Sequence, residues 1–410
     1  MQNRLSNLYS FLLKYKLPLV IISLIILKII FYPGMAEGDD LYYTRYAADL
    51  ANGKFKAFFL FQARWMVWVP TALLYWLIGI NTVTTAVIPI LYTSVSLILA
   101  YCIVLKATNS KAIALNSVVL YGTLPLVLTY GNFLQVAPAL EMLTLATVYL
   151  AQRAVHSGKY RYYLWCGLSL GLIVYTRITG MFIAVPVTAY VIYKKGFSSN
   201  TLLKLSLTAV VATIPFWIQG LVYYIIQNDF WRRLQLSKGL LHLQKAAPGM
   251  GSKEIFYYFR TLFIKEGFAN WHCFSITGYL LVPAVAVVIY NRFIRHKHTG
   301  AMLFLGWLVI YILLMSFVPT ALDPYTVLAR NIRYTIIFTL PMSALIVSAF
   351  KTVLTWIRLN RYLWLFILLI AVINLAFEIP LYQYRSDYAD RQKYAVTRIL
   401  QEYPDSRIYT

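Results

Sequence analysis

The chain has 410 residues, 60% of them apolar, and carries 37 Lys and Arg against only 14 Asp and Glu. A soluble domain could not bury so much apolar surface, and the apolar runs of about 18 or more residues are each typical of a transmembrane helix. The runs are continuous rather than alternating, which excludes a β-barrel. The net charge of +23 indicates cytoplasmic loops of a membrane protein rather than nucleic-acid binding.

The first apolar run, about 11–32, follows the basic segment "MQNRLSNLYSFLLKYK". A basic segment before an apolar run is typical of an uncleaved signal anchor and of a cleavable signal peptide. The second alternative stays open because "GMA" before Glu37 resembles a cleavage site. We favour the anchor, since the run is long and the Pro33–Gly34 turn suits the exit of a helix. The N-terminus is then cytoplasmic, and we expect Lys28 to extend its amine to the interface.

The segment "WVPTALLYWLIGI", residues 68–80, decides the topology that follows. If it crossed the membrane, the charges further along the chain would fall on the wrong sides. Its length of about 13 residues is too short for a hydrocarbon core of ~30 Å. We therefore expect it to lie along the membrane surface, and Lys106 and Lys111 are then cytoplasmic, after a span at 82–105.

With this choice, the basic loops between the later spans all face the cytoplasm. The predicted topology has about eleven spans, with the N-terminus inside and the C-terminus outside. After 11–32 and 82–105, the predicted spans are 112–130, 137–152, 161–176, 180–193, 203–226, 272–290, 301–317, 334–350 and 362–380.

The chain is therefore expected to form one transmembrane domain, 1–380, with a short external tail, 381–410. Three external segments interrupt the domain: a first loop at 33–81, a large basic loop at 227–271 and a late loop at 318–333. No internal sequence repeat is visible, which disfavours the many transporter folds that are built from repeats.

Three acids stand together in the first external loop, at Glu37, Asp39 and Asp40. They precede a helix-like stretch, 41–52, which Gly53 is expected to end. One interpretation is an N-cap, in which a carboxylate accepts the N–H groups of the first helical turn. The other is a general base that takes a proton from a hydroxyl group at the membrane surface. The two interpretations are compatible for neighbouring residues.

The large external loop is basic, although the positive-inside rule requires no charge there. Its cations include Arg232, Arg233, Arg260 and Lys265, and aromatic residues such as Trp231 lie between them. An interfacial helix that touches anionic headgroups would have this composition. A site for a phosphate-bearing lipid would have it too, because Arg and Lys stabilise a leaving phosphate.

Further arginines stand at the outer ends of later spans. Arg330 and Arg333, followed by Tyr334, are either interfacial anchors or donors to a phosphate in a cavity that Asp39 also faces. Arg177 in "TRITG" either caps the carbonyl groups of the preceding helix or binds the same ligand. Carboxylates, guanidinium groups and an apolar bundle together suit glycosyl transfer from a lipid-phosphate sugar.

Four stretches are distinctive: "GDDLYYTRYAADLANGKF", "VPTALLYWLIG", "RYYLWCGLSLGLIVYTRITGMFIAVP" and "NIRYTIIFTLP". They resemble the first external loop, the juxtamembrane helix, a helix hairpin and the late Arg-Tyr motif of the GT-C superfamily of membrane glycosyltransferases. The nearest groups are the lipid A aminoarabinose transferases and the protein O-mannosyltransferases, and the resemblance runs over about residues 10–350.

The resemblance implies an all-α polytopic membrane protein with the GT-C fold, a polyprenyl-phosphate-sugar donor and an external aspartate as the base. Asp39 matches the first acid of the family pair and Asp40 the second, and Tyr43 is the tyrosine that follows them. These residues are the expected site, with Asp39 as the first choice for the base.

The second external loop departs from the family pattern. Ala137 stands where relatives often place another acid, so either Glu141, one turn later, substitutes for that acid in binding the substrate or the role is absent. We therefore expect no tightly held metal, although a divalent cation, Mg²⁺ or Mn²⁺, stays open as a cofactor.

The expected function is transfer of a hexosyl or pentosyl group to a lipid, polysaccharide or protein of the cell envelope, on the external face of the plasma (inner) membrane. The expected partners are the donor, the acceptor and membrane lipids, with no nucleic acid and a monomeric protein. A flippase or transporter of a lipid-linked saccharide is the alternative, followed by a non-enzymatic envelope scaffold. A transporter should carry ionisable residues deep within its spans, whereas the polar clusters here are expected at outer ends.

Overall fold

The computed structural model describes residues 16–32, 34, 39–54, 60–236, 257–260, 262, 274–296, 300–322, 325–327 and 332–402. Within these ranges, the side chains of residues 259, 319–322, 325–327, 332–334 and 388–402 are not described. The described chain is almost entirely helical. It also contains two short antiparallel strands, β1 (Pro319–Leu322) and β2 (Tyr325–Val327), in the segment predicted as a late external loop.

Helices succeed one another through the N-terminal half with short connections between them. In chain order they are α2 (Lys16–Ile30), α3 (Asp39–Ala51), the 3₁₀ helix η1 (Leu60–Ala63), α4 (Trp65–Ile78), α5 (Thr82–Thr108), α6 (Lys111–Gly122), α7 (Pro125–Tyr130), α8 (Val136–Ser157), α9 (Tyr160–Ile173), η2 (Ile178–Ile183), α10 (Ala184–Lys195) and α11 (Ser199–Gln227).

The described helices of the C-terminal part differ widely in length. They are α13 (Tyr257–Arg260), α14 (Ser275–Phe293), α15 (Ala301–Phe317), η3 (Ile332–Phe338), α16 (Thr339–Trp356), η4 (Asn360–Tyr362) and α17 (Leu363–Glu402). Each predicted span therefore overlaps one or two helices within the described residues. Five described helical segments are long and apolar enough to cross a membrane, beginning at Thr82, Ser199, Ser275, Thr335 and Asn360. The predicted fold class, an all-α polytopic membrane protein, is confirmed.

The structure corrects several predicted boundaries. The predicted span 112–130 is two helices, because Pro125 at the start of α7 is preceded by an extended residue, Leu124, and cannot continue α6. The predicted helix 41–52 begins at Asp39 instead. The predicted last span, 362–380, continues through Pro380 as one helix to Glu402.

The surface helix predicted at 68–80 is α4, which has 14 residues and packs against α3. It ends as expected at Gly79, whose φ of +98° is strained for residues other than glycine. A 14-residue helix measures about 21 Å, which is short for a hydrocarbon core of ~30 Å. Its last turn exposes Trp76, Leu77 and Ile78, the kind of side chains that an interfacial helix presents to lipid.

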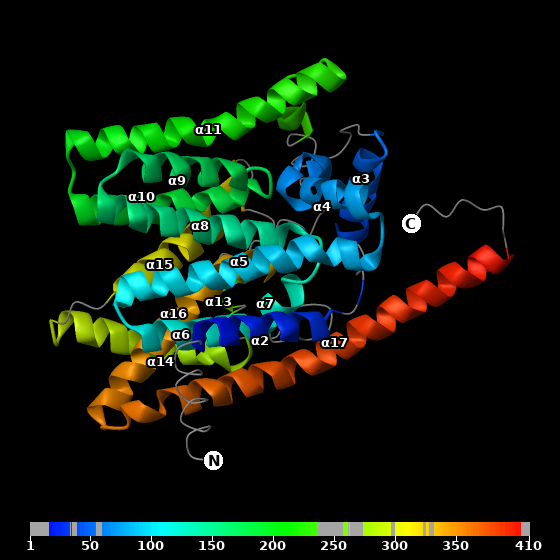
Figure 1. Ribbon diagram of the computed structural model, residues 1–410. Coiled ribbons are helices and arrows are strands. Elements are labelled where there is room, and N and C mark those ends of the chain that lie inside the picture. Colours follow the sequence, from blue (N-terminus) through cyan, green and yellow to red (C-terminus); the bar gives the residue numbers. More distant parts are fainter. Residues whose placement is uncertain are drawn as a thin grey trace, which may run out of the picture.

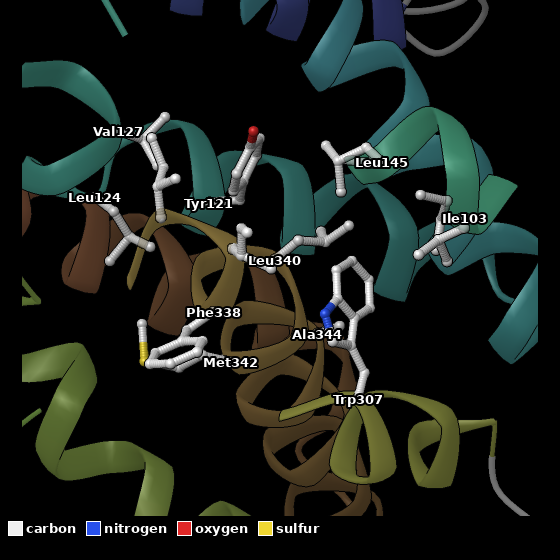
Figure 2. Packing of buried hydrophobic residues seen from close by; sticks show 14 of the residues in the cluster. Ile103, Tyr121, Leu124, Val127, Leu145, Trp307, Phe338, Leu340, Met342 and Ala344 are labelled. Carbon is white, nitrogen blue, oxygen red and sulfur yellow. The ribbon is translucent and has the colours of Figure 1, made fainter. Parts of the chain in front are cut away.

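The core of the bundle is centred on α16. In the most apolar window of this helix 78% of residues are buried, against 28% in α11, so α11 faces outward and α16 is enclosed. Figure 2 shows Leu340, Met342 and Ala344 of α16 packed among side chains of other helices, including Tyr121 of α6 and Trp307 of α15. Such close packing, rather than hydrophobicity alone, holds helices together in lipid.

The helices run roughly parallel to one another and define two ends of the bundle (Figure 1). At one end lie the connections α5–α6, α8–α9, α10–α11, α14–α15 and α16–α17, on the left of the view. We call it the basic end, because the segments 106–111, 152–161, 194–199, 291–300 and 351–361 contain Lys and Arg but no Asp or Glu. Helices α3 and α4 lie at the opposite end, which we call the α3 end.

Candidate functional site

The first turn of α3 carries both acids of the predicted pair. Asp39 and Asp40 are therefore helical rather than residues before the helix, and their charges lie where a helix dipole favours anions. Asp40 is only 3% exposed, and its Oδ1 accepts a hydrogen bond of 2.8 Å from the backbone N–H of Leu134. Asp39 is more exposed than Asp40. The neighbouring carboxylates thus have different surroundings, one of them fixed by another element.

Tyr43, one turn after Asp39, is fully buried and bonded to a residue that the sequence analysis did not select. Arg64, between η1 and α4, donates from Nη1 to the Tyr43 hydroxyl at 2.6 Å. The Arg64 guanidinium also lies over the ring of Phe61, 4.4 Å from its centroid. In the sequence Arg64 is marked only by its position just before an apolar helix, and no motif selects it.

Asp39 and Arg64 share an electrostatic neighbourhood. Burial raises the pKa of Tyr46, and the charge of Asp39 raises it further, whereas that of Arg64 lowers it. Both groups belong to the α3 end, but their exposure differs: Asp39 is half-buried, whereas Arg64 is only 7% exposed and is bound to Tyr43.

Arg233 lies in the same region and is 6% exposed. Its Nη1 donates to the carbonyl of Ala63 at 2.8 Å, and its Nη2 donates to the carbonyl of Val174. Gln219 of α11 also donates to Ala63, at 2.8 Å. Burial lowers the pKa of Arg233 to about 10, so the group stays charged at neutral pH. These contacts connect the segment after α11 with η1 and the end of α9.

The other predicted cations have more varied positions. Arg177 precedes η2, is half-buried, and donates from Nε to the hydroxyl of Thr179 at 3.1 Å. Arg232 is half-buried, and Arg260 is exposed at the end of α13. Their roles as ligands of a phosphate stay predictions. Five other predicted residues cannot be placed in the site. The side chains of Arg333 and Tyr334 in η3 are not described, and Glu37, Lys265 and Arg330 lie outside the described residues.

Glu141 is buried in α8, 2% exposed, and accepts a hydrogen bond of 3.2 Å from the hydroxyl of Thr339. It lies in the interior of the bundle together with two ionisable residues that the sequence analysis misjudged. Lys28 was expected to reach the interface, but it is 0% exposed. Glu378 of α17, which was not selected, is 3% exposed. The expectation that polar clusters occur only at outer ends was therefore wrong.

The signal for this buried cluster was present in the sequence. Lys28 in "LIILKII" and Glu378 in "NLAFEIP" are ionisable residues inside apolar runs, which are rare and usually functional in membrane helices. The same feature was named as typical of a transporter, so the buried cluster alone does not separate the two classes of function. The comparison with known proteins bears on that choice.

A family model described as dolichyl-phosphate-mannose-protein mannosyltransferase matches residues 62–219, which is less than half of the chain. No curated protein sequence matches the chain. Among solved structures, ArnT from Cupriavidus metallidurans, bound to undecaprenyl phosphate, superposes with a TM-score of 0.60 over 81% of this chain at 12% identity. The chain has the GT-C fold. The resemblance seen in the sequence is thereby confirmed at the level of the fold.

A second GT-C structure agrees. The oligosaccharyltransferase AglB from Archaeoglobus fulgidus, in complex with an inhibitory peptide and a dolichol-phosphate, gives a TM-score of 0.56 over 92% of this chain at 14% identity. The chain spans only 59% of the length of the ArnT structure and 56% of that of AglB. The GT-C likeness thus covers most of this chain but little more than half of the solved structures.

The donor set for a metal ion is poor in the part of the chain that the structure describes. No group of three or more His, Cys, Asp or Glu lies together there. At the place where an acid was expected from the family pattern, Ala137 is buried at the start of α8. The described residues therefore do not fit a metal centre made by several carboxylates, and no chemical step is assigned to a cation.

Proposed function

We propose that this GT-C protein is a membrane glycosyltransferase that takes a sugar from a polyprenyl-phosphate donor and moves it to a hydroxyl-bearing acceptor of the cell envelope. The reaction takes place at the external face of the membrane, at the α3 end; the Lys and Arg gathered at the basic end support this orientation. The GT-C fold supports this proposal, and so do the solved relatives with undecaprenyl phosphate and with dolichol-phosphate.

Asp39 acts as the general base in this proposal. The acceptor hydroxyl gives its proton to the Asp39 carboxylate while its oxygen forms a bond to the anomeric carbon. The bond between that carbon and the phosphate oxygen breaks, and the polyprenyl phosphate leaves with the electron pair. Arg64 acts near Asp39 and stabilises the charge that develops on the phosphate, together with cations of the external loops such as Lys265 and Arg330.

The observation that carries the assignment is the contrast between the paired acids. Asp40 is buried against the Leu134 amide, whereas the adjacent Asp39 is half-buried at the end of the bundle. A base must reach the hydroxyl that it deprotonates, and the more exposed carboxylate of the pair meets this geometric requirement better.

The test is transfer by the purified protein in liposomes that contain a radiolabelled polyprenyl-phosphate sugar and a cell-envelope acceptor fraction. We expect label in the acceptor and an equal amount of free polyprenyl phosphate. A flippase would instead move the intact donor between leaflets without breaking its sugar–phosphate bond. Intact donor that changes leaflet, with no free polyprenyl phosphate, would therefore replace this proposal by the transporter alternative.

A further inference from the structure

A cluster of three ionisable side chains lies inside the bundle, away from the surface of α3 and α4. Lys28, Glu141 and Glu378 come from α2, α8 and α17 and are 0%, 2% and 3% exposed. The positive charge of Lys28 is attracted by both carboxylates. Buried charges are costly in a membrane and are retained where partners compensate them, usually for a function. The glycosyl transfer proposed above does not use this buried cluster.

The hydrogen bonds of the buried cluster converge on α7 and the turn that follows it. Lys28 donates from Nζ to the carbonyl of Val127 at 2.8 Å. Glu378 accepts from the hydroxyl of Thr129, at 2.8 Å and 2.9 Å from its two oxygens. The backbone carbonyl of Lys28 accepts from the Asn132 amide at 2.9 Å. Helices at both ends of the chain thus hold one short segment, 127–132.

Gly131 leaves the room that this arrangement needs. A Cβ atom at this position would lie 2.5 Å from the Lys28 amine and 2.4 Å from the Val127 carbonyl oxygen. The Gly131 carbonyl itself accepts from the hydroxyl of Thr93 of α5 at 2.8 Å. Because real Cβ atoms do not approach so closely, any side chain here must displace the lysine or the turn.

The α7–α8 turn also contacts the candidate site. Two residues after Asn132, the backbone N–H of Leu134 donates to Asp40 at 2.8 Å. A continuous set of contacts therefore leads from the buried cluster, through the α7–α8 turn, to the carboxylate next to Asp39. The turn has a fixed position because charged groups of α2 and α17 bind it from inside.

We propose that Lys28, Glu378 and Gly131 are positioning residues: they fix the α7–α8 turn, and the turn holds Asp40 and thereby the first turn of α3 with Asp39. Glu141 belongs to the same cluster and balances the charge of Lys28. This inference rests on the proposed function in so far as it predicts effects on turnover, but the anchoring of Asp40 can be measured without any substrate.

The experiment compares Gly131→Ala with Gly167→Ala in the full-length protein reconstituted in nanodiscs. Gly167 in α9 is a matched control, because a Cβ there would lie 2.3 Å from the Thr208 carbonyl oxygen of α11, a similar clash away from the turn. The readouts are hydrogen–deuterium exchange of the Leu134 amide, the melting temperature and the turnover number. Glu378→Leu removes the acceptor of the Thr129 hydroxyl, and Glu378→Gln is the conservative variant, since it keeps an oxygen that accepts from Thr129.

In Gly131→Ala and Glu378→Leu we expect exchange at Leu134 to rise by about tenfold or more, whereas Glu378→Gln should keep exchange near that of the wild type. Turnover of the first two variants should fall by about tenfold to a hundredfold, the usual effect of a small misplacement of catalytic groups. Gly167→Ala should lower the melting temperature without either effect. Asp40→Asn, which keeps an accepting oxygen, should preserve the protection of Leu134, and Asp40→Leu should remove it.

Unchanged exchange at Leu134 in both Gly131→Ala and Glu378→Leu would overturn the inference, whatever the transferase assay shows. Equal losses of turnover in Gly131→Ala and Gly167→Ala would also overturn it, because the buried cluster would then serve stability alone. The two proposals can also fail separately. If the wild-type protein transfers no sugar but the variants change exchange at Leu134 as expected, the proposed function is contradicted and the anchoring is supported.

Discussion

The two ends of the bundle use charge in different ways. At the basic end, cations lie on aromatic rings: Arg295 is 4.6 Å from the ring centroid of Trp356, and Arg153 and Arg161 flank Tyr162 at 5.3 Å and 4.9 Å. Its connecting segments contain no acid. These three arginines are exposed, whereas charged groups of the α3 end are buried and bond to the backbone of other elements, as Asp40 does to Leu134 and Arg233 to Ala63.

This difference suggests that charges at the basic end set the orientation in the membrane, whereas charges at the α3 end serve the candidate site. Cations on aromatic rings at a membrane surface anchor the protein and set its orientation, and each is replaceable by another. Charges that bond across elements have a defined partner and geometry, and their loss has specific consequences. Substitutions of like chemistry at the two ends should therefore have very different effects on transfer.

The largest effect is expected at Asp39. Asn has a similar shape but cannot accept a proton, so Asp39→Asn should reduce transfer by about 10²–10⁴-fold, the usual contribution of a general base. The melting temperature should stay near that of the wild type. Transfer of radiolabelled sugar and thermal unfolding measure the two quantities. Asp49→Asn, in the same helix, is the control and should transfer normally.

An Asp39→Asn protein with a near-normal rate would assign the base to Asp40. If Asp40→Asn were active as well, the catalytic interpretation of the first external loop would be wrong. The acids would then serve only the helix terminus, and a transporter function would become the better account.

A smaller effect is expected for single external cations. By analogy with lost oxyanion donors, removing a group that stabilises the leaving phosphate costs roughly 2–4 kcal/mol, or a hundredfold or more in turnover. We expect this loss for Arg64→Ala and for at least one of Arg330, Arg333 and Lys265 changed to Ala. Steady-state kinetics with the lipid donor measure the loss of turnover. Near-normal rates in all four variants would show that these cations do not stabilise the leaving phosphate.

At the basic end the corresponding change should affect stability only. Arg295→Ala removes a guanidinium from the rings of Trp356 and Tyr290, which is expected to cost about 0.5–1 kcal/mol. Unfolding followed in detergent measures this loss, and the transfer rate should equal that of the wild type. A strong loss of transfer in a normally folded Arg295→Ala protein would show that the basic end has a chemical role.

The smallest effect is expected from chelators. Because Ala137 replaces the expected acid and the described residues contain no cluster of metal ligands, transfer should continue unchanged in EDTA. The comparison is the transfer rate before and after dialysis against the chelator. Loss of activity that Mg²⁺ or Mn²⁺ restores would show that a cation takes part after all.

Much of the fold could be predicted because bilayers admit few solutions. The length of each apolar run predicts a helix that can cross the membrane. The positions of Lys and Arg between the runs predict the direction in which each helix crosses. Breaks were harder to place: Pro125 divides a continuous apolar run into α6 and α7, and a hydropathy pattern cannot distinguish a broken helix from an intact one. The continuation of α17 beyond residue 380 was hidden by the polar composition of that stretch.

The candidate site could be predicted only in part. The pair at 39 and 40 was visible because acids are rare in this chain, but their different burial depends on Leu134, which is distant in sequence. Arg64 is an ordinary residue in the sequence and becomes notable only through the Tyr43 hydroxyl. Lys28 and Glu378 are 350 positions apart, and no local pattern indicates that both bind the segment after α6.

Helix α17 is long enough to extend well beyond the bundle at the α3 end. Its 40 residues measure about 60 Å, roughly twice the hydrocarbon thickness of a bilayer. In Figure 1 its last part leaves the bundle and extends beyond α3 and α4. A fluorescent reporter or purification tag attached after Glu402 would therefore start about 30 Å along the helix from Pro380, beyond α3 and α4 in this view.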